Sequence, residues 1–198
     1  MEILIIAFGY LLGSIPSGYL AGKWISNIDI RQIGSGSTGA TNVLRHVGKS
    51  PALIVFLIDV IKGTLPVLIA RNFHLNDYWQ VAAGLTALMG HIWPIWLRWK
   101  GGKAVATGLG MLLGITWQVG IACFGVFLAM LAFSRIVSIS SISAALSLPI
   151  FMFFSFSHDN FSPAYLGLSL ITMTIVIYKH SSNIKRLLDG NEPRIGQS

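Results

Sequence analysis

A glycine-rich polar segment, residues 34–49, carries the residue types best suited to chemistry. It reads Gly-Ser-Gly-Ser-Thr-Gly-Ala-Thr-Asn-Val-Leu-Arg-His-Val-Gly-Lys. Its first three glycines lack a Cβ atom, so the backbone can turn sharply and come close to a ligand. A short helix over 40–47 would then present unpaired amide groups that favour an anion. The segment therefore predicts a phosphate site, and the plain alternative is a flexible polar linker.

Short polar side chains surround these glycines and supply hydrogen-bonding groups. Thr41 and Arg45 are four residues apart, so both would lie on one face of the short helix and could reach the same ligand. The candidate substrate-binding residues here are Gly34, Gly36, Ser37, Gly39, Thr41 and Asn42.

Three further polar clusters stand out in the rest of the chain. Lys103 follows two glycines and immediately precedes a predicted helix, which favours a phosphate-binding role. Arg98 and Lys100 fit basic anchors at a membrane surface instead. His180 and Asn183 would share one helix face, and a serine-rich run spans residues 138–143.

Three ionisable residues in apolar surroundings leave two interpretations open. Asp59 and Lys62 lie three residues apart in an apolar stretch, where they are costly unless paired, so they are either functional or a structural pair between helices. His91 precedes Pro94, and its expected role is to hydrogen-bond backbone groups that a proline kink releases.

The composition identifies an integral membrane protein. Of its 198 residues, 54% are hydrophobic and only 11% are charged, less than half the charged fraction of soluble domains. The net charge of +7 fits basic residues on the cytoplasmic side of a membrane, so no nucleic-acid partner is expected. Cys123 is the single cysteine, so no internal disulfide can form.

The apolar stretches predict an all-α fold of seven transmembrane helices in one domain, residues 1–198. Residues 104–133 are long for one span. A break near Trp117 makes two short crossings and places nearly all basic loop residues on one side. The N-terminus is then outside, the C-terminus is cytoplasmic, and the four polar clusters converge on the cytoplasmic face.

Several chemistries find no residues to support them. We expect no metal site and no cofactor, because no His, Cys, Asp and Glu group has ligand spacing. None of the five histidines has an aspartate five positions on, the acid–base arrangement of common glycerolipid acyltransferases. A transporter for an organic anion and a membrane assembly protein are the rival classes, but the chain shows no internal repeat of the transporter kind.

The polar clusters together resemble the motifs of the bacterial acyl-phosphate:glycerol-3-phosphate acyltransferases, the PlsY family, over the whole chain. Ser37 stands where that family usually has asparagine, and Ala104 where it usually has glycine. The matching positions are Gly34, Ser35, Gly36, Gly39, Ala40, Thr41, Asn42 and Arg45; Asp59, Lys62 and Gly63; Gly90, His91, Pro94, Lys100, Gly101, Gly102, Lys103 and Thr107; and His180, Asn183, Ile184, Arg186, Gly190 and Glu192.

The resemblance implies a monomeric multi-pass enzyme of the bacterial inner membrane with its active site facing the cytoplasm. It would move an acyl chain from acyl phosphate to the 1-hydroxyl of glycerol 3-phosphate, giving lysophosphatidic acid and phosphate. Because no protein base is evident among the residues, we expect a substrate phosphate oxygen to accept the hydroxyl proton. The residues expected to be catalytic are Ser35, Arg45, Lys103, His180 and Asn183; those expected to bind substrate are the glycine-segment residues above and Ser141.

Overall fold

The computed structural model describes residues 1–155 and 162–196, and its regular elements there are all helices. The chain divides into two compact units, residues 1–115 and 116–198. The first unit contains α1 (Glu2–Gly13), α2 (Ser17–Ser26), η1 (Ile30–Gln32), α3 (Ala40–His46), α4 (Lys49–Asn72), α5 (Asp77–Ile92), η2 (Ile95–Leu97) and α6 (Val105–Ile115). The second contains α7 (Trp117–Ser134), α8 (Val137–Ser155), α9 (Pro163–Lys179) and α10 (Ser181–Leu188).

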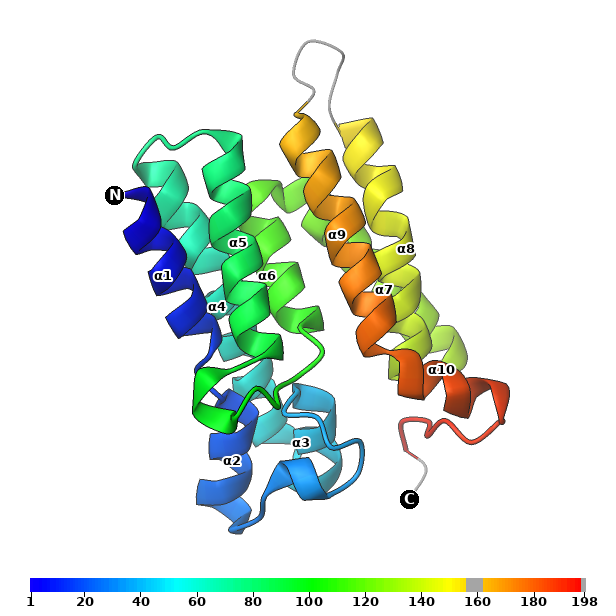
Figure 1. Ribbon diagram of the computed structural model, residues 1–198. Helices are drawn as coiled ribbons and strands as arrows, with labels where there is room; N and C mark the ends of the chain where they lie inside the picture. Colours follow the sequence, from blue (N-terminus) through cyan, green and yellow to red (C-terminus); the bar gives the residue numbers. More distant parts are fainter. Residues whose placement is uncertain (156–161, 197–198) are drawn as a thin grey trace. The chain divides into compact units, whose positions relative to one another are not determined.

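Small residues let the long helices of the first unit pack closely. In this unit α4 contacts α1, α5 and α6, and α1 also packs on α5 (Figure 1). A Cβ atom at Gly13 would overlap the backbone of Ala87, and one at Gly110 would overlap the backbone of Val60. Helix–helix packing in membranes relies on small residues of this kind because lipid supplies no hydrophobic drive between helices.

The outward faces of these helices are apolar while part of the interior is polar. On α4, Leu53, Leu57 and Ile61 are exposed, whereas Asp59 and Lys62 are buried. An exposed apolar stripe of this length would be a liability in water, and it suits a helix surrounded by lipid.

Four helical stretches within the described residues are long and apolar enough to cross a membrane. They are residues 2–26, in which α1 and α2 are counted together, and the helices α4, α7 and α8. The apolar helices α6 and α9 are shorter, and the 11 residues of α6 span only about 16 Å. The prediction of an all-helical membrane protein is confirmed at this level.

Two predicted helix breaks are confirmed. The segment from Gly13 to Gly18, expected to kink or pack closely, separates α1 from α2. The break expected near Trp117 falls at Thr116, whose extended backbone (φ −148°, ψ 98°) ends α6 and begins α7.

The second unit is an antiparallel hairpin of α7 and α8, with α9 packed on α8 (Figure 1). Helix α9 begins with Pro163 after the cap residue Ser162, a position where the missing N–H costs nothing. The short helix α10 follows α9 directly at His180.

Candidate functional site

The glycine-rich segment forms an ordered loop, residues 33–39, whose shape depends on Asn42. The Asn42 side chain is 2% exposed. Its amide nitrogen donates to the carbonyl oxygens of Ile30, Ile33 and Ser37 at 2.9, 3.1 and 3.0 Å. Its carbonyl oxygen accepts from the Ser35 amide at 3.2 Å. Asn42 therefore closes this loop from inside, a role that the sequence did not indicate.

Glycine is required at two positions of this loop. Gly34 and Gly36 have φ values of 58° and 67°, the left-handed region that other residues enter only at a cost. A Cβ atom at Gly34 would also overlap the side chains of His46 and Asn42. The loop is thus built by its glycines and is not a flexible linker.

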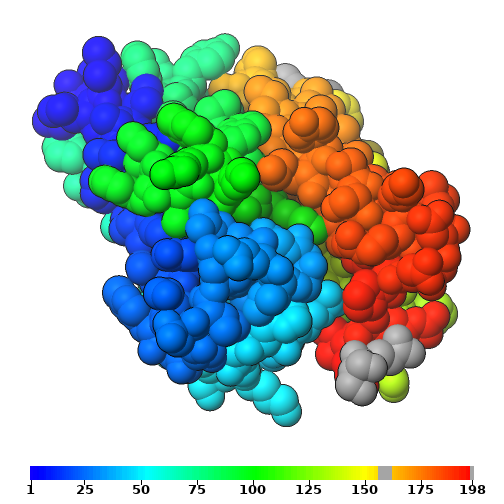
Figure 2. Space-filling model, turned by 60° about the horizontal axis from the view of Figure 1, so that its bottom comes forward, coloured from blue at the N-terminus to red at the C-terminus, as the bar shows by residue number. Residues whose placement is uncertain are grey.

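The other predicted residues of the segment lie on and beside this loop. Ser35 and Arg45 are exposed, and Thr41 is half-buried. Thr41 and Arg45 stand one turn apart on α3, as expected. The Ser37 hydroxyl accepts from the Gly39 amide at 3.3 Å, so the serine that replaces the family's usual asparagine helps to form the turn before α3. The segment from α2 to α3 forms an exposed surface, blue in Figure 2.

A small apolar cluster anchors the loop to α4. Ile30, Val43, Ala52 and Val55 pack together and are nearly fully buried. Beside them Arg31 forms an ion pair with Asp29 at 2.6 Å and lies 4.9 Å from the centre of the Tyr19 ring. Its hydrogen bonds hold the pKa of the Asp29 carboxyl below its usual value.

Lys103 ends a second glycine loop, residues 100–103, which bonds back to the end of α5. The amides of Gly101 and Gly102 donate to the carbonyls of Ile92 and His91 at 3.2 and 3.1 Å. Lys103 is half-buried and lies two residues before α6, as predicted, while Lys100 is exposed. Ala104 adopts φ 58°, a left-handed conformation that suits glycine, the residue that the resemblance leads us to expect there.

The imidazole of His91 does not have the predicted role. The carbonyls of His91 and Ile92 at the end of α5 accept from the two glycine amides instead. The ring nitrogen Nδ1 of His91 lies 3.6 Å from Asp59 Oδ1. Asp59 is also 2.7 Å from Lys62 Nζ. The costly intramembrane charges are therefore paired, and both a functional and a structural role stay predictions.

In the second unit, the carboxylate of Glu192 accepts hydrogen bonds from three polar side chains. Its Oε1 accepts from the Ser138 hydroxyl at 2.7 Å and from Asn183 Nδ2 at 2.6 Å. Its Oε2 accepts from Arg186 Nε at 2.7 Å. Burial alone would raise the pKa of Glu192, but these three donors outweigh it and lower the pKa. The sequence indicated Glu192 only as a motif match. The signal that could have revealed its role is a single acidic residue close in sequence to the hydrogen-bond donors Asn183 and Arg186.

The other predicted residues of this unit bond to their own helices. His180 is 3% exposed, and its Nδ1 lies 2.8 Å from the Val176 carbonyl. A carbonyl can only accept, so Nδ1 carries the hydrogen and Nε2 is the acceptor in the neutral ring. The Ser141 hydroxyl donates to the Val137 carbonyl at 2.9 Å. A substrate-binding role for Ser141 stays a prediction.

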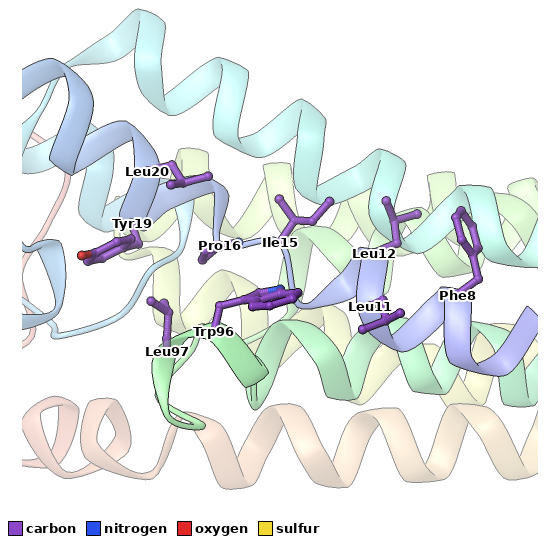
Figure 3. A pocket seen from close by; sticks show the side chains of 9 residues that line it. All are labelled: Phe8, Leu11, Leu12, Ile15, Pro16, Tyr19, Leu20, Trp96 and Leu97. Atoms are coloured by element: carbon purple, nitrogen blue, oxygen red, sulfur yellow. The ribbon is translucent and has the colours of Figure 1, made fainter.

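An apolar groove of about 580 Å³ runs along the first unit. Figure 3 shows side chains of α1, of the link to α2, of α2 and of η2 lining it: Phe8, Leu11, Leu12, Ile15, Pro16, Tyr19, Leu20, Trp96 and Leu97. In a membrane such a lining meets acyl chains, so it fits lipid but does not by itself identify a substrate.

The chemistry available in these clusters is anion binding. Both glycine loops combine close backbone approach with a nearby cation, Arg45 in one and Lys103 in the other. Within residues 1–155 and 162–196, no group of three or more His, Cys, Asp or Glu side chains is arranged to hold a metal ion.

Comparison with known proteins identifies the family. The family model described as glycerol-3-phosphate acyltransferase matches residues 3–190. This chain belongs to the glycerol-3-phosphate acyltransferase family. Family members from Prochlorococcus marinus, each also called glycerol-3-phosphate acyltransferase, are similar over the full length. The protein of strain NATL1A is 62% identical over 197 residues and all of both chains; that of strain MIT 9313 is 66% identical over 197 residues, 100% of this chain and 96% of its own.

Solved structures agree with this family in fold. A crystal structure of PlsY (YgiH), an integral membrane glycerol 3-phosphate acyltransferase in its glycerol 3-phosphate form, is 37% identical with a TM-score of 0.92, covering 98% of this chain and 96% of that one. The lysophosphatidic acid form is 36% identical with a TM-score of 0.89, over 98% and 95% of the two chains. The protein is thus a membrane enzyme of the glycerol-3-phosphate acyltransferase family.

Proposed function

We propose that this acyltransferase uses acyl phosphate as donor and esterifies the 1-hydroxyl of glycerol 3-phosphate, releasing lysophosphatidic acid and phosphate. The observation that carries the proposal is the presence in one unit of two glycine loops, residues 33–39 and 100–103, together with two cations, Arg45 and Lys103. A donor and an acceptor that both carry phosphate require two anion sites. Relatives solved in a glycerol 3-phosphate form and a lysophosphatidic acid form support this acceptor and product.

Each loop has a part in this proposal. The loop 33–39 binds the phosphate of the donor through its backbone amides, with Ser35, Thr41 and the glycines Gly34, Gly36 and Gly39 close to the headgroup. Arg45 and Lys103 bind glycerol 3-phosphate, since cations neutralise a phosphate most effectively when a rigid backbone fixes them. Asn42 and Ser37 contribute by shaping the loop.

Residues of the second unit take part in the same reaction. His180 and Asn183 are the polar residues at the start of α10, and the hydrogen bond to Glu192 fixes the Asn183 amide. We assign them to glycerol 3-phosphate, and Ser141 to substrate binding. We propose a single catalytic domain that covers residues 1–198.

The reaction needs little acid–base help from the protein. Acyl phosphate is a mixed anhydride whose carbonyl is already activated, and its leaving phosphate needs little protonation near neutral pH. The hydroxyl oxygen of glycerol 3-phosphate attacks the acyl carbon, the bond from that carbon to the phosphate oxygen breaks, and a substrate phosphate oxygen accepts the hydroxyl proton. Orientation of two bound substrates is worth about 7–11 kcal/mol, and the cations stabilise the developing oxyanion.

The membrane arrangement follows from the charges in the loops. We propose seven spans in a bacterial inner membrane, with the N-terminus outside, the C-terminus in the cytoplasm and a monomeric enzyme. Support comes from the basic residues of segments 23–49, 98–103 and 179–194, which the orientation rule places on the cytoplasmic side. Water-soluble glycerol 3-phosphate would then reach the loops from the cytoplasm.

A donor comparison tests the proposed reaction. Purified protein in detergent receives glycerol 3-phosphate with one of three donors: acyl phosphate, acyl-coenzyme A or acylated acyl carrier protein. Lysophosphatidic acid and phosphate are then measured. We expect product from acyl phosphate alone, with equal amounts of phosphate. Product from a thioester donor would overturn the donor assignment. Lys103→Ala should lower kcat/KM by about 100-fold, whereas Lys100→Ala, in the same loop but exposed, should stay within about twofold.

A further inference from the structure

A buried polar cluster lies in the first unit beneath the loop that carries Lys103. Its members are Ser17, Asp59, Lys62 and His91, each no more than 7% exposed. Asp59 Oδ1 accepts from the Ser17 hydroxyl at 2.5 Å, lies 2.7 Å from Lys62 Nζ and lies 3.6 Å from His91 Nδ1. One carboxylate oxygen thus joins α2, α4 and α5.

The ammonium group of Lys62 is satisfied as completely as a buried cation requires. Besides Asp59 it donates to the Ile15 carbonyl at 2.8 Å and to the Ser17 hydroxyl at 3.4 Å. Ile15 lies in the link where α1 ends and α2 begins. A buried ion pair is weak support for stability, because apolar residues of similar size often replace it at no cost. The four side chains therefore need a further explanation.

Each end of this cluster lies next to one of the two glycine loops, directly through His91 and through the neighbour of Ser17 at the other end. A Cβ atom at Gly18, the neighbour of Ser17, would overlap the carbonyl of Thr38 in the first loop. At the other end, a Cβ atom at Gly102 would overlap the His91 imidazole, and Gly102 also donates its amide to the His91 carbonyl. The ring of His91 is the surface on which the residue before Lys103 rests.

We infer that His91, held in place by the Asp59–Lys62 pair, is a positioning residue that fixes where Lys103 meets the phosphate of glycerol 3-phosphate. Asp59 fixes the ring orientation, the ring fixes Gly102, and Gly102 fixes Lys103. The inference rests on the substrate role of Lys103 proposed above. It assigns no contact with substrate to His91, Asp59 or Lys62.

Steady-state kinetics with each substrate varied separately test this role. His91→Leu removes the nitrogen that faces Asp59 and should raise KM for glycerol 3-phosphate about tenfold, while KM for acyl phosphate changes less than about threefold. His91→Asn places a nitrogen near the position of Nδ1 and should restore most of the affinity. Equal changes in both KM values, or no difference between the two variants, would overturn the inference.

A double-variant comparison separates positioning from general loss of structure. If His91 acts through Lys103, then His91→Leu should change KM for glycerol 3-phosphate less than about twofold in a Lys103→Gln background. Full additivity of the two changes would contradict the inference. If His91→Leu does not fold, Ser17→Ala, which removes one contact to Asp59 and keeps the ion pair, is measured in the same two backgrounds.

The outcome for Lys103 itself distinguishes the two proposals. If Lys103→Ala leaves kcat/KM unchanged, the substrate role of Lys103 fails, and the inference fails with it. If Lys103→Ala abolishes activity while His91→Leu folds and leaves both KM values unchanged, only the positioning role is wrong.

Discussion

Two polar residues, Ser35 in the loop 33–39 and Asn42 beside it on α3, have different roles. Asn42 is buried, and its side-chain amide donates to three backbone carbonyls and accepts from one backbone amide. Ser35 is exposed on the loop, where its hydroxyl can meet a ligand. From the sequence alone both are expected to be site residues, because both have short polar side chains. The burial of each side chain in the structure distinguishes their roles.

Substitution should separate these two tasks. Asn42→Ala leaves buried carbonyls without a donor and should lower the free energy of unfolding by about 2–3 kcal/mol. Ser35→Ala should change it by less than about 0.5 kcal/mol yet lower kcat/KM by about 100-fold. Denaturant or thermal unfolding in detergent, together with the phosphate-release assay, checks both. A stable, active Asn42→Ala protein would show that the loop holds its shape by other means.

The carboxylate of Glu192 should make the second unit sensitive to acid. Its folded pKa lies below the ordinary 4.5 because of its three donors, which outweigh the effect of burial. A lowered pKa means that the stabilisation is complete above about pH 4.5 and is lost as the pH falls through the folded pKa. Glu192→Gln should cost about 1–3 kcal/mol at pH 7, and the difference from wild type should shrink toward pH 3.

The control for this change is Asp189→Asn, an exposed acid in the same segment. Unfolding temperatures of wild type and both variants at several pH values give the comparison. A Glu192→Gln deficit that stays constant across the pH series would show that packing, not the charge of Glu192, matters there.

At the scale of elements, the junction between the second glycine loop and α6 holds backbone strain. Ala104 adopts φ 58°, and a left-handed backbone costs a residue with a Cβ atom about 1–2 kcal/mol. Ala104→Gly removes that cost, but glycine loses more conformational entropy on folding, which offsets part of the gain. The net effect should be to stabilise the protein by about 0.5–1 kcal/mol. Thermal unfolding measures the change.

Ala106 in the first turn of α6 provides the matched control. Its backbone is helical, so Ala106→Gly should leave the stability unchanged or lower it. Equal stabilisation by the two glycine variants would mean that the strain at Ala104 is not the cause.

Element positions could largely be predicted from the sequence, because apolar stretches and basic loops determine them. Glycine and proline residues predict the break after Gly13. The distribution of basic residues predicts a break near Trp117, which the structure places at Thr116. The contacts of His91 and the hub at Glu192 could not be predicted. They depend on which helix faces meet. Tertiary packing decides this, and local sequence patterns do not reveal it.

At the scale of the whole molecule, the proposed topology predicts which loops can be labelled from outside the cell. Cys123 is the single cysteine, so Cys123→Ser gives a background for new cysteines. A cysteine at Asn76, between α4 and α5, should react with a membrane-impermeant maleimide in intact cells. Cysteines at Lys49, Lys100 and Asp189 should react only after the membrane is permeabilised. Labelling of Lys49 and Lys100 from opposite sides would contradict the topology.

In the proposed mechanism, the enzyme neutralises and positions two phosphate-bearing substrates and leaves proton transfer to a substrate phosphate. The pH profile of kcat/KM for glycerol 3-phosphate, in wild type and His180→Gln, tests this most directly. We predict that kcat/KM rises with pH as the substrate phosphate loses its second proton near about pH 6, and that His180→Gln lowers the profile without moving its inflection. Loss of that inflection in His180→Gln, with glycerol 3-phosphate binding unchanged, would identify histidine as the base and contradict the account.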